Sequence, residues 1–252
     1  MVTIYEKIDR YHEVISTVRP FEGHMLKQLK DYYRIGLSWS SNALEGNTLT
    51  ISETKVVLED GLTIGGRPLR DFYETVGHGQ AYDFMFTLIK DKYITLNNIR
   101  TMHHLFCKNI DELNAGTWRK ELVIVSGTDY VFPKPQDIEE QMLRLEKWIK
   151  VERKNYHPVT FAALLHLKFV SIHPFIDGNG RISRLIMNLS LLQDGYQLAI
   201  IPPVLRAEYY DSIRQYQNKD KADPFCDFIG ERLYETQKEI MRMLYIPFPK
   251  LV

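Results

Sequence analysis

The chain has 252 residues, enough for one sizeable core, and its 44% hydrophobic and 25% charged residues are ordinary for a globular protein. Lys and Arg together number 32, as do Asp and Glu, so the formal net charge is zero. This balance excludes an overall basic field for nucleic acid or anionic membrane, and partners must be recognised locally.

No segment has the pattern of a signal peptide or a membrane span. The N-terminus is charged at residues 6, 7, 9 and 10, and the longest apolar run, residues 159–172, is too short for a bilayer. Cys107 and Cys226 have no metal-ligand spacing and are expected to be buried free thiols. These features predict a cytoplasmic protein.

Apolar residues recur at helical spacing along most of the chain. In order, the predicted helices cover residues 3–17, 21–44, 52–60, 70–90, 95–109, 135–152, 158–172, 179–193, 206–217 and 223–244. Thr50 and Glu53 form a capping-box pattern. Pro135 and Pro158 suit first helical turns, and Gly195 follows a helix end. The pattern predicts a mostly α-helical protein.

Residues 122–132, LVIVSGTDYVF, depart from this periodicity. Two β-prone runs flank the turn-forming residues 126–129, which predicts a β-hairpin. Such a hairpin is either a structural corner or a flap whose edge pairs with an extended peptide.

The densest polar stretch is HPFIDGNGRISR, residues 173–184, and its centre is similar to an EF-hand calcium loop. An EF-hand has Gly at its sixth position and carboxylates at its first and twelfth. With Gly180 at the sixth position, Phe175 and Ile186 take the other two. Neither side chain can bind calcium, so the segment is not an EF-hand.

The same stretch has the features of a phosphate site. Gly178 and Gly180 let the backbone approach a ligand closely, and a helix beginning near Asn179 directs its free N–H groups into the loop. Arg181 and Arg184 are three residues apart and therefore share a face of that helix. This much positive charge suits a diphosphate or triphosphate better than a monophosphate.

Two further side chains in the stretch add chemistry. Asp177 would repel a polyphosphate unless a cation such as Mg²⁺ stood between them, which indicates a nucleotide bound with Mg²⁺. His173 has an ordinary pKa near neutrality and could take a proton from an attacking hydroxyl.

These residues resemble the signature of the Fic family, HxFx(D/E)GNGRxxR, at every fixed position. The similarity extends to SSNALEGNTLT at 40–50, GTWRKELVIV at 116–125 and VLRAEYYDSI at 204–213. The fold that the resemblance implies is the all-α Fic-type helical bundle with a small β-hairpin flap.

The resemblance implies transfer of AMP from ATP to a Ser, Thr or Tyr hydroxyl of a target protein. His173 would be the general base, Asp177 would hold Mg²⁺, and Phe175 would anchor the loop in the core. The residues implied to bind the phosphates are Gly178, Asn179, Gly180, Arg181 and Arg184.

A second motif precedes the first. Ser41 and Glu45 in SNALEG match the inhibitory pattern (S/T)xxxE(G/N) of self-restrained Fic proteins, and their spacing places them on one helix face. The family likeness implies that Glu45 pairs with Arg184 and excludes the γ-phosphate.

Other assignments rest on the resemblance alone. The flap is expected within residues 123–131, with an edge formed by Val123, Ile124 and Val125. Tyr209 and Tyr210 fall in a helix that contributes to the adenine pocket in the family, although core packing explains them equally well. Asn188 lies near the site by helical spacing.

The expected organisation is residues 1–50 as N-terminal helices that include the inhibitory helix, and residues 51–252 as the catalytic core, in one compact unit. Expected partners are ATP, an unknown target protein and the chain itself through auto-modification, and a homo-oligomer is left open. No DNA-binding domain is evident. Alternative functions are removal of AMP, with Glu45 positioning water, or a toxin–antitoxin or scaffold binding module.

Overall fold

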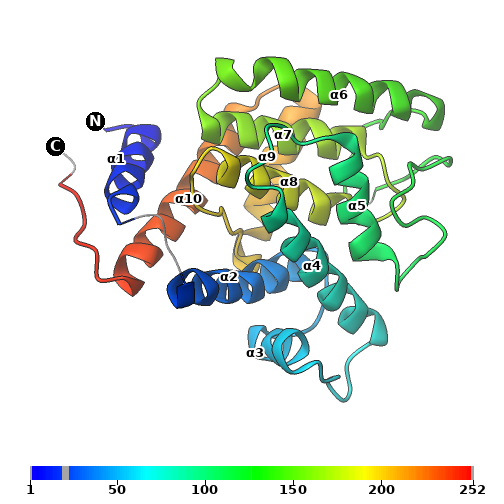
Figure 1. Ribbon diagram of the computed structural model, residues 1–252. Coiled ribbons are helices and arrows are strands. Elements are labelled where there is room, and N and C mark those ends of the chain that lie inside the picture. Colours follow the sequence, from blue (N-terminus) through cyan, green and yellow to red (C-terminus); the bar gives the residue numbers. More distant parts are fainter. Residues whose placement is uncertain (1, 19–22, 126, 251–252) are drawn as a thin grey trace.

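The computed structural model describes residues 2–18, 23–125 and 127–250. Within them the chain forms α-helices joined by loops and short 3₁₀ or π turns (Figure 1). The elements are α1 Ile4–Ser16, α2 Gly23–Leu44, α3 Ile51–Lys55, the π turn η1 Val56–Asp60, α4 Leu69–Thr87, α5 Leu96–Cys107, η2 Pro135–Asp137, α6 Ile138–Glu152, η3 Arg153–Asn155, α7 Pro158–Ile172, α8 Asn179–Gln193, η4 Pro203–Leu205, α9 Arg206–Lys219 and α10 Asp223–Met243. The helical prediction is confirmed, while the predicted helix start at residue 21 lies outside the described residues.

Local chemistry sets several helix starts as expected. The Thr50 side chain accepts a hydrogen bond from the backbone N–H of Glu53 at 3.2 Å, and the Glu53 carboxylate accepts one from the backbone of Thr50 at 2.7 Å. This reciprocal pair satisfies two donors that a helix start leaves free. Pro158 stands at the first turn of α7, where a missing N–H costs nothing.

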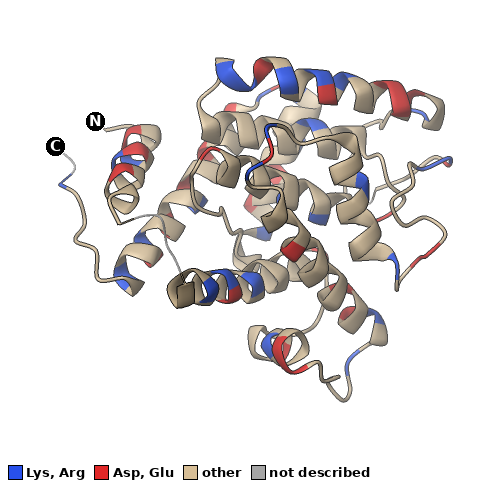
Figure 2. Ribbon diagram, viewed as in Figure 1, with Lys and Arg blue, Asp and Glu red and all other residues tan. Residues whose placement is uncertain are grey.

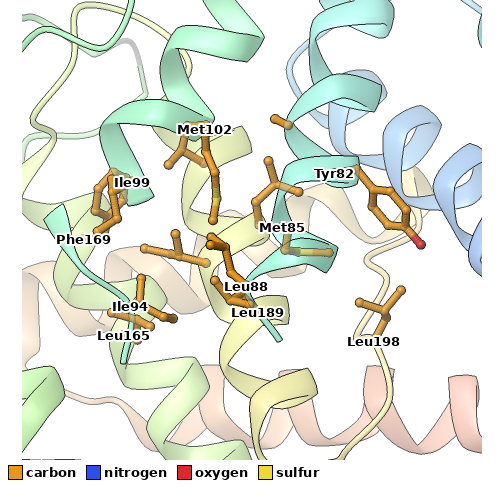
Figure 3. Close-up of a cluster of buried hydrophobic side chains, with 14 of the residues drawn as sticks. Tyr82, Met85, Leu88, Ile94, Ile99, Met102, Leu165, Phe169, Leu189 and Leu198 are labelled. Carbon is orange, nitrogen blue, oxygen red and sulfur yellow. The ribbon is translucent and has the colours of Figure 1, made fainter. Parts of the chain in front are cut away.

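Helices α7 and α8 form the centre of the bundle and pack extensively on each other. The other elements surround them: α6 lies along α7, α4 packs on both α2 and α5, and α1 lies beside α10 (Figure 1). The core is continuous across these helices, so side chains of α1 and α2 share it with those of α4 to α8. Figure 3 shows part of this core, with labelled members Tyr82, Met85, Leu88, Ile94, Ile99, Met102, Leu165, Phe169, Leu189 and Leu198.

The predicted β-hairpin is wrong. Over the described part of the chain there is no β-strand, and residues 118–134 run as an extended loop around Ser126, which lies outside the described residues. Three of the apolar side chains that suggested strands are exposed, by 76% at Leu122, 98% at Ile124 and 87% at Val131, whereas Val123, Val125 and Phe132 are partly buried. An isolated two-stranded ribbon is marginally stable, so the β-prone composition alone does not produce one.

Both cysteines are buried and unpaired, as expected. Acidic and basic residues are interspersed along the described ribbon, as in α6 (Figure 2). In the ranges that the structure describes, no helix combines the length and apolar character needed to span a membrane.

Candidate active site

The polar loop between α7 and α8 is held in one conformation by its own side chains. His173 ends α7 in the left-handed region, with φ 53°, and Gly178 begins α8 with φ 80°. The Asn179 side chain accepts a hydrogen bond from the Phe175 backbone N–H at 2.9 Å and donates one to the Phe175 carbonyl at 2.8 Å. Phe175 is fully buried in the core, so the loop is fastened at its middle.

His103, on α5, supports this loop, and sequence reasoning missed it. Its ring stacks on Phe175 with centroids 3.6 Å apart. Because Nδ1 accepts a hydrogen bond from Gly116 N–H at 2.8 Å, Nε2 carries the proton and donates to the Asp177 carbonyl at 3.0 Å. Burial lowers the pKa of His103 to about 4, so the ring is neutral. No motif in α5 marks this role.

Helix α8 begins without a side-chain cap on its first backbone donors. Gly178, the residue before its first turn, has no side chain to cap it. The N–H groups of the first turn therefore point into the loop, where the helix dipole favours an anion. A Cβ added to Gly180 would lie 2.2 Å from a Glu45 carboxylate oxygen, which shows how closely that carboxylate approaches the helix start.

Arg184 is the best-satisfied cation of the site and is only 2% exposed. Its Nη2 donates to Glu45 Oε1 and to the Ser41 carbonyl, both at 2.8 Å, and its Nε donates to Ser41 Oγ at 2.9 Å. Its Nη1 donates to the Tyr209 hydroxyl at 3.0 Å. The Arg184 guanidinium thus makes four hydrogen bonds, one of which is the predicted contact with Glu45.

Glu45 is anionic in this arrangement. Burial acts to raise the pKa of its carboxyl, but the nearby Arg184 and Arg181 guanidiniums outweigh burial and hold the pKa below its usual range. Its second oxygen accepts a hydrogen bond from the Tyr210 hydroxyl at 3.2 Å.

Tyr209 and Tyr210 have different surroundings. The Tyr209 ring is buried. Its hydroxyl lies 2.8 Å from Nε2 of His166 and also accepts the hydrogen bond from Arg184 Nη1. Tyr210 is partly buried and faces Glu45, with its ring 4.8 Å from the Arg206 guanidinium. Asn188 has a structural role, because its side-chain N–H group donates hydrogen bonds to the backbone carbonyls of Arg184 and Ala199.

A second ionic cluster surrounds Asp177. Its Oδ1 accepts hydrogen bonds from Gly178 N–H at 2.6 Å and Arg181 at 3.1 Å, and its Oδ2 accepts one from Arg70 at 2.5 Å. Glu74, a buried residue of α4, pairs with both arginines at 3.0 Å. Neither Arg70 nor Glu74 was identified from the sequence, because nothing in α4 resembles a site motif.

A cavity of about 410 Å³ joins several of these groups. Its lining includes His173, Gly180, Glu45, Tyr209 and Tyr210, and residues Val125 and Phe132 from the loop 118–134. Of the other residues expected in the flap, Val123 is partly buried and Ile124 is exposed.

Burial lowers the pKa of His173 to about 4, with the Val170 carbonyl opposing part of this shift. The imidazole is therefore neutral at neutral pH and can accept a proton. The Phe132 ring lies 4.6 Å from it, so the loop 118–134 covers the histidine.

Asp177, in the loop before α8, is a partly exposed carboxylate of the kind that could hold a metal ion. Elsewhere in the described ranges, no three His, Cys, Asp or Glu side chains come together as a possible metal site. Mg²⁺ commonly binds one carboxylate together with water and phosphate oxygens, so Asp177 fits a metal that arrives with a nucleotide.

The described residues form an all-helical protein with a neutral histidine beside an uncapped helix start. Residues 93–191 match the model of the Fic/DOC family. The chain therefore contains a Fic/DOC family segment over these residues.

Curated relatives support this assignment. A protein of Drosophila mojavensis named Protein adenylyltransferase Fic is 34% identical over 231 residues, which cover 91% of this chain and 45% of the relative. A Drosophila grimshawi protein of the same name is also 34% identical, over 91% of this chain and 47% of its own length. The chain thus spans about half the length of the curated relatives it matches.

Solved structures share the fold. Fic-1 of C. elegans superposes with a TM-score of 0.84 at 26% identity, over 95% of this chain and 70% of that one. A Fic domain containing signaling protein from Bacteroides thetaiotaomicron gives a TM-score of 0.84 at 24% identity, over 96% of this chain and 100% of its own.

Proposed function

We propose that this protein is an ATP-dependent protein adenylyltransferase that moves AMP to a Ser, Thr or Tyr hydroxyl of a target protein. The names of its curated relatives support the reaction class. The observation that carries the proposal is a single cavity lined by the neutral His173, by Gly180 at the uncapped start of α8, and by Glu45.

The chemistry follows from these groups. His173 accepts the proton of the target hydroxyl, whose oxygen forms a bond to the α-phosphorus as the bond to the pyrophosphate oxygen breaks. The N–H groups at the start of α8 stabilise the charge that develops on the phosphates, and Arg181 and Arg184 extend this stabilisation. Pyrophosphate leaves, and AMP remains on the target.

Asp177 would hold Mg²⁺, which supplies neutralisation of phosphate charge. Tyr209 and Tyr210 both line the cavity, and Tyr210, the less buried of the two, is the one that would contact a nucleotide. Val125 and Phe132 belong to the segment that would present a target hydroxyl to His173.

The same geometry supports self-inhibition. The Glu45 carboxylate occupies Arg184 and lies beside the start of α8, so it neutralises the cation and adds negative charge where a γ-phosphate would bind. Productive ATP binding then requires Glu45 to leave.

The test is incubation of purified variants with α-labelled ATP. Glu45→Gly is expected to increase labelling of the protein or of lysate proteins at least about tenfold. A tenfold change corresponds to about 1.4 kcal/mol in the free energy of productive ATP binding. Adding His173→Ala should reduce that labelling about 10²-fold or more, since the general base is lost. Glu112→Gly, which removes an exposed loop carboxylate, should behave as the unchanged protein. Labelling that does not rise with Glu45→Gly contradicts self-inhibition, and labelling that survives His173→Ala contradicts the reaction.

A second candidate is removal of AMP from a modified target, because Glu45 and His173 line the same cavity and could position and activate water. To test this candidate, protein labelled by the Glu45→Gly variant is used as the substrate. Release of AMP when the unchanged protein is added would support hydrolysis, whereas stable label would leave transfer as the reaction.

A further inference from the structure

The carboxylate of Asp177 is already paired with a cation from outside the loop between α7 and α8. Arg70 Nη2 lies 2.5 Å from Asp177 Oδ2, while Arg181 and the Gly178 N–H bind Oδ1. Arg70 belongs to the first turn of α4, more than one hundred residues away along the chain. The oxygen that it covers is the one left free by the loop itself.

Arg70 and Arg181 differ in how firmly they are held. The Arg181 side chain is 4% exposed and lies against Glu74 and the Phe106 ring, so it is a fixed part of the site. The Arg70 side chain is 59% exposed and is tied to the protein by its Nε bond to Glu74 Oε1 at 3.0 Å. The end of the Arg70 side chain can therefore move away from Asp177 into water while Arg70 Nε stays bound to Glu74.

We propose that Arg70 is a displaceable counter-cation, which covers the metal-binding oxygen of Asp177 until a nucleotide–metal complex takes its place. The inference rests on the proposed function, because it assumes that Asp177 receives Mg²⁺ with ATP. Arg70 then acts in two opposite ways. Without a metal it neutralises a carboxylate that would repel the triphosphate, and with a metal it competes for the same oxygen.

This double role makes a prediction that distinguishes Arg70 from an ordinary phosphate-binding arginine. Arg70→Gln removes the charge but keeps a donor for Glu74. In EDTA the variant should bind nucleotide more weakly, since Asp177 is left uncovered. In saturating Mg²⁺ it should bind nucleotide more tightly, since nothing has to be displaced. Each change is expected to be roughly two- to fivefold, the range of a partly exposed ion pair.

The experiment is isothermal titration of the non-hydrolysable analogue AMP-PNP into the full chain, with Mg²⁺ or with EDTA. Glu45→Gly is the parent, so that the inhibitory carboxylate does not interfere. Arg144→Gln is the matched control, because Arg144 also pairs with a glutamate four residues away, Glu140, on an exposed helix face and has no contact with Asp177. It should leave both affinities unchanged.

Asp177→Asn provides a second check. In that background Arg70→Gln should have no effect in Mg²⁺, since there is no carboxylate for arginine and metal to share. Weaker AMP-PNP binding by Arg70→Gln in both conditions would make Arg70 a phosphate-binding residue and overturn the inference. Unchanged affinity in both would reduce the ion pair to a surface contact and also overturn it. If the Glu45→Gly parent itself binds no AMP-PNP in Mg²⁺, the proposed function fails, and the inference fails with it.

Discussion

Arg119 connects the loop between α7 and α8 to the loop 118–134, which covers His173. The side chain is 2% exposed, and its guanidinium donates hydrogen bonds to the carbonyls of His173 at 2.7 Å, Glu121 at 2.9 Å and Pro133 at 2.6 Å. Its backbone N–H donates to the Pro174 carbonyl at 2.8 Å. One residue thereby joins both ends of the covering segment to the turn that carries the histidine.

Replacing Arg119 with Met keeps most of the buried volume but leaves three carbonyls without donors. The expected cost is about 1–3 kcal/mol in the free energy of unfolding, measured in urea. Labelling by the Glu45→Gly protein should fall as well, because the His173 turn and its cover lose their common anchor. Lys120→Met, at the exposed neighbouring position, is the control and should change neither quantity. An Arg119→Met protein with full stability would show that the carbonyls find water instead.

At the scale of elements, the close approach of α4 and α5 supports the site from behind. Gly77 of α4 faces the backbone of α5, and a Cβ there would lie 2.2 Å from the Phe106 carbonyl oxygen. A Cβ on Gly178 would in turn lie 3.0 Å from the Phe106 ring, and the Arg181 guanidinium lies 4.5 Å from the centroid of that ring. The spacing of these two helices therefore sets the position of the start of α8.

Gly77→Ala is expected to separate α4 from α5, because a backbone oxygen cannot yield as a flexible side chain would. The overpacking should lower the free energy of unfolding by about 1–3 kcal/mol. Gly36→Ala in α2 is the matched control, since its Cβ would meet only Ile200 Cδ1 at 3.7 Å. That change should be neutral or stabilising by about 0.5–1 kcal/mol, the usual advantage of Ala over Gly in a helix. Equal thermal unfolding of the two variants would contradict this account of the α4–α5 contact.

For the molecule as a whole, buried neutral histidines determine the response to acid. Burial lowers the pKa of His78 to about 3 and that of His103 and His173 to about 4, and it lowers the pKa of His166 as well. An unfolded histidine has a pKa of about 6.5. Between these values the unfolded chain binds more protons than the folded one, so the stabilisation from neutral burial is complete above about pH 6.5 and declines below it.

The free energy of unfolding in urea should therefore be nearly constant from about pH 8 to 7 and should decrease from about pH 6.5 towards pH 4. Each histidine contributes up to about 1.4 kcal/mol per pH unit in this window. Because burial causes the shifts, added salt should leave the profile largely unchanged. A flat profile down to pH 5 would mean that these rings become charged without unfolding.

Short-range patterns explain how much could be predicted from the sequence. Helical periodicity and capping residues such as Thr50 and Glu53 act within one or two turns, so the helices and several of their starts follow from the chain alone. The segment from His173 to Arg184 is equally local, and its residue types already predict a base, a carboxylate for a metal ion and an anion site. Ser41 and Glu45 were predicted by resemblance to a known motif.

Tertiary structure decided the remaining features, because they depend on contacts between residues distant along the chain. Ile124 has strand-forming character but no surface to pack against, so no hairpin forms there. His103 and Glu74 have no motif around them, and they lie at the site only because α4 and α5 pack against the loop between α7 and α8. The sequence by itself determined which chemical groups the loop carries. The packing of α2 and α4 decided which cations and carboxylates meet them, since an ion pair between Arg184 and Glu45, or between Arg70 and Asp177, exists only in the folded bundle.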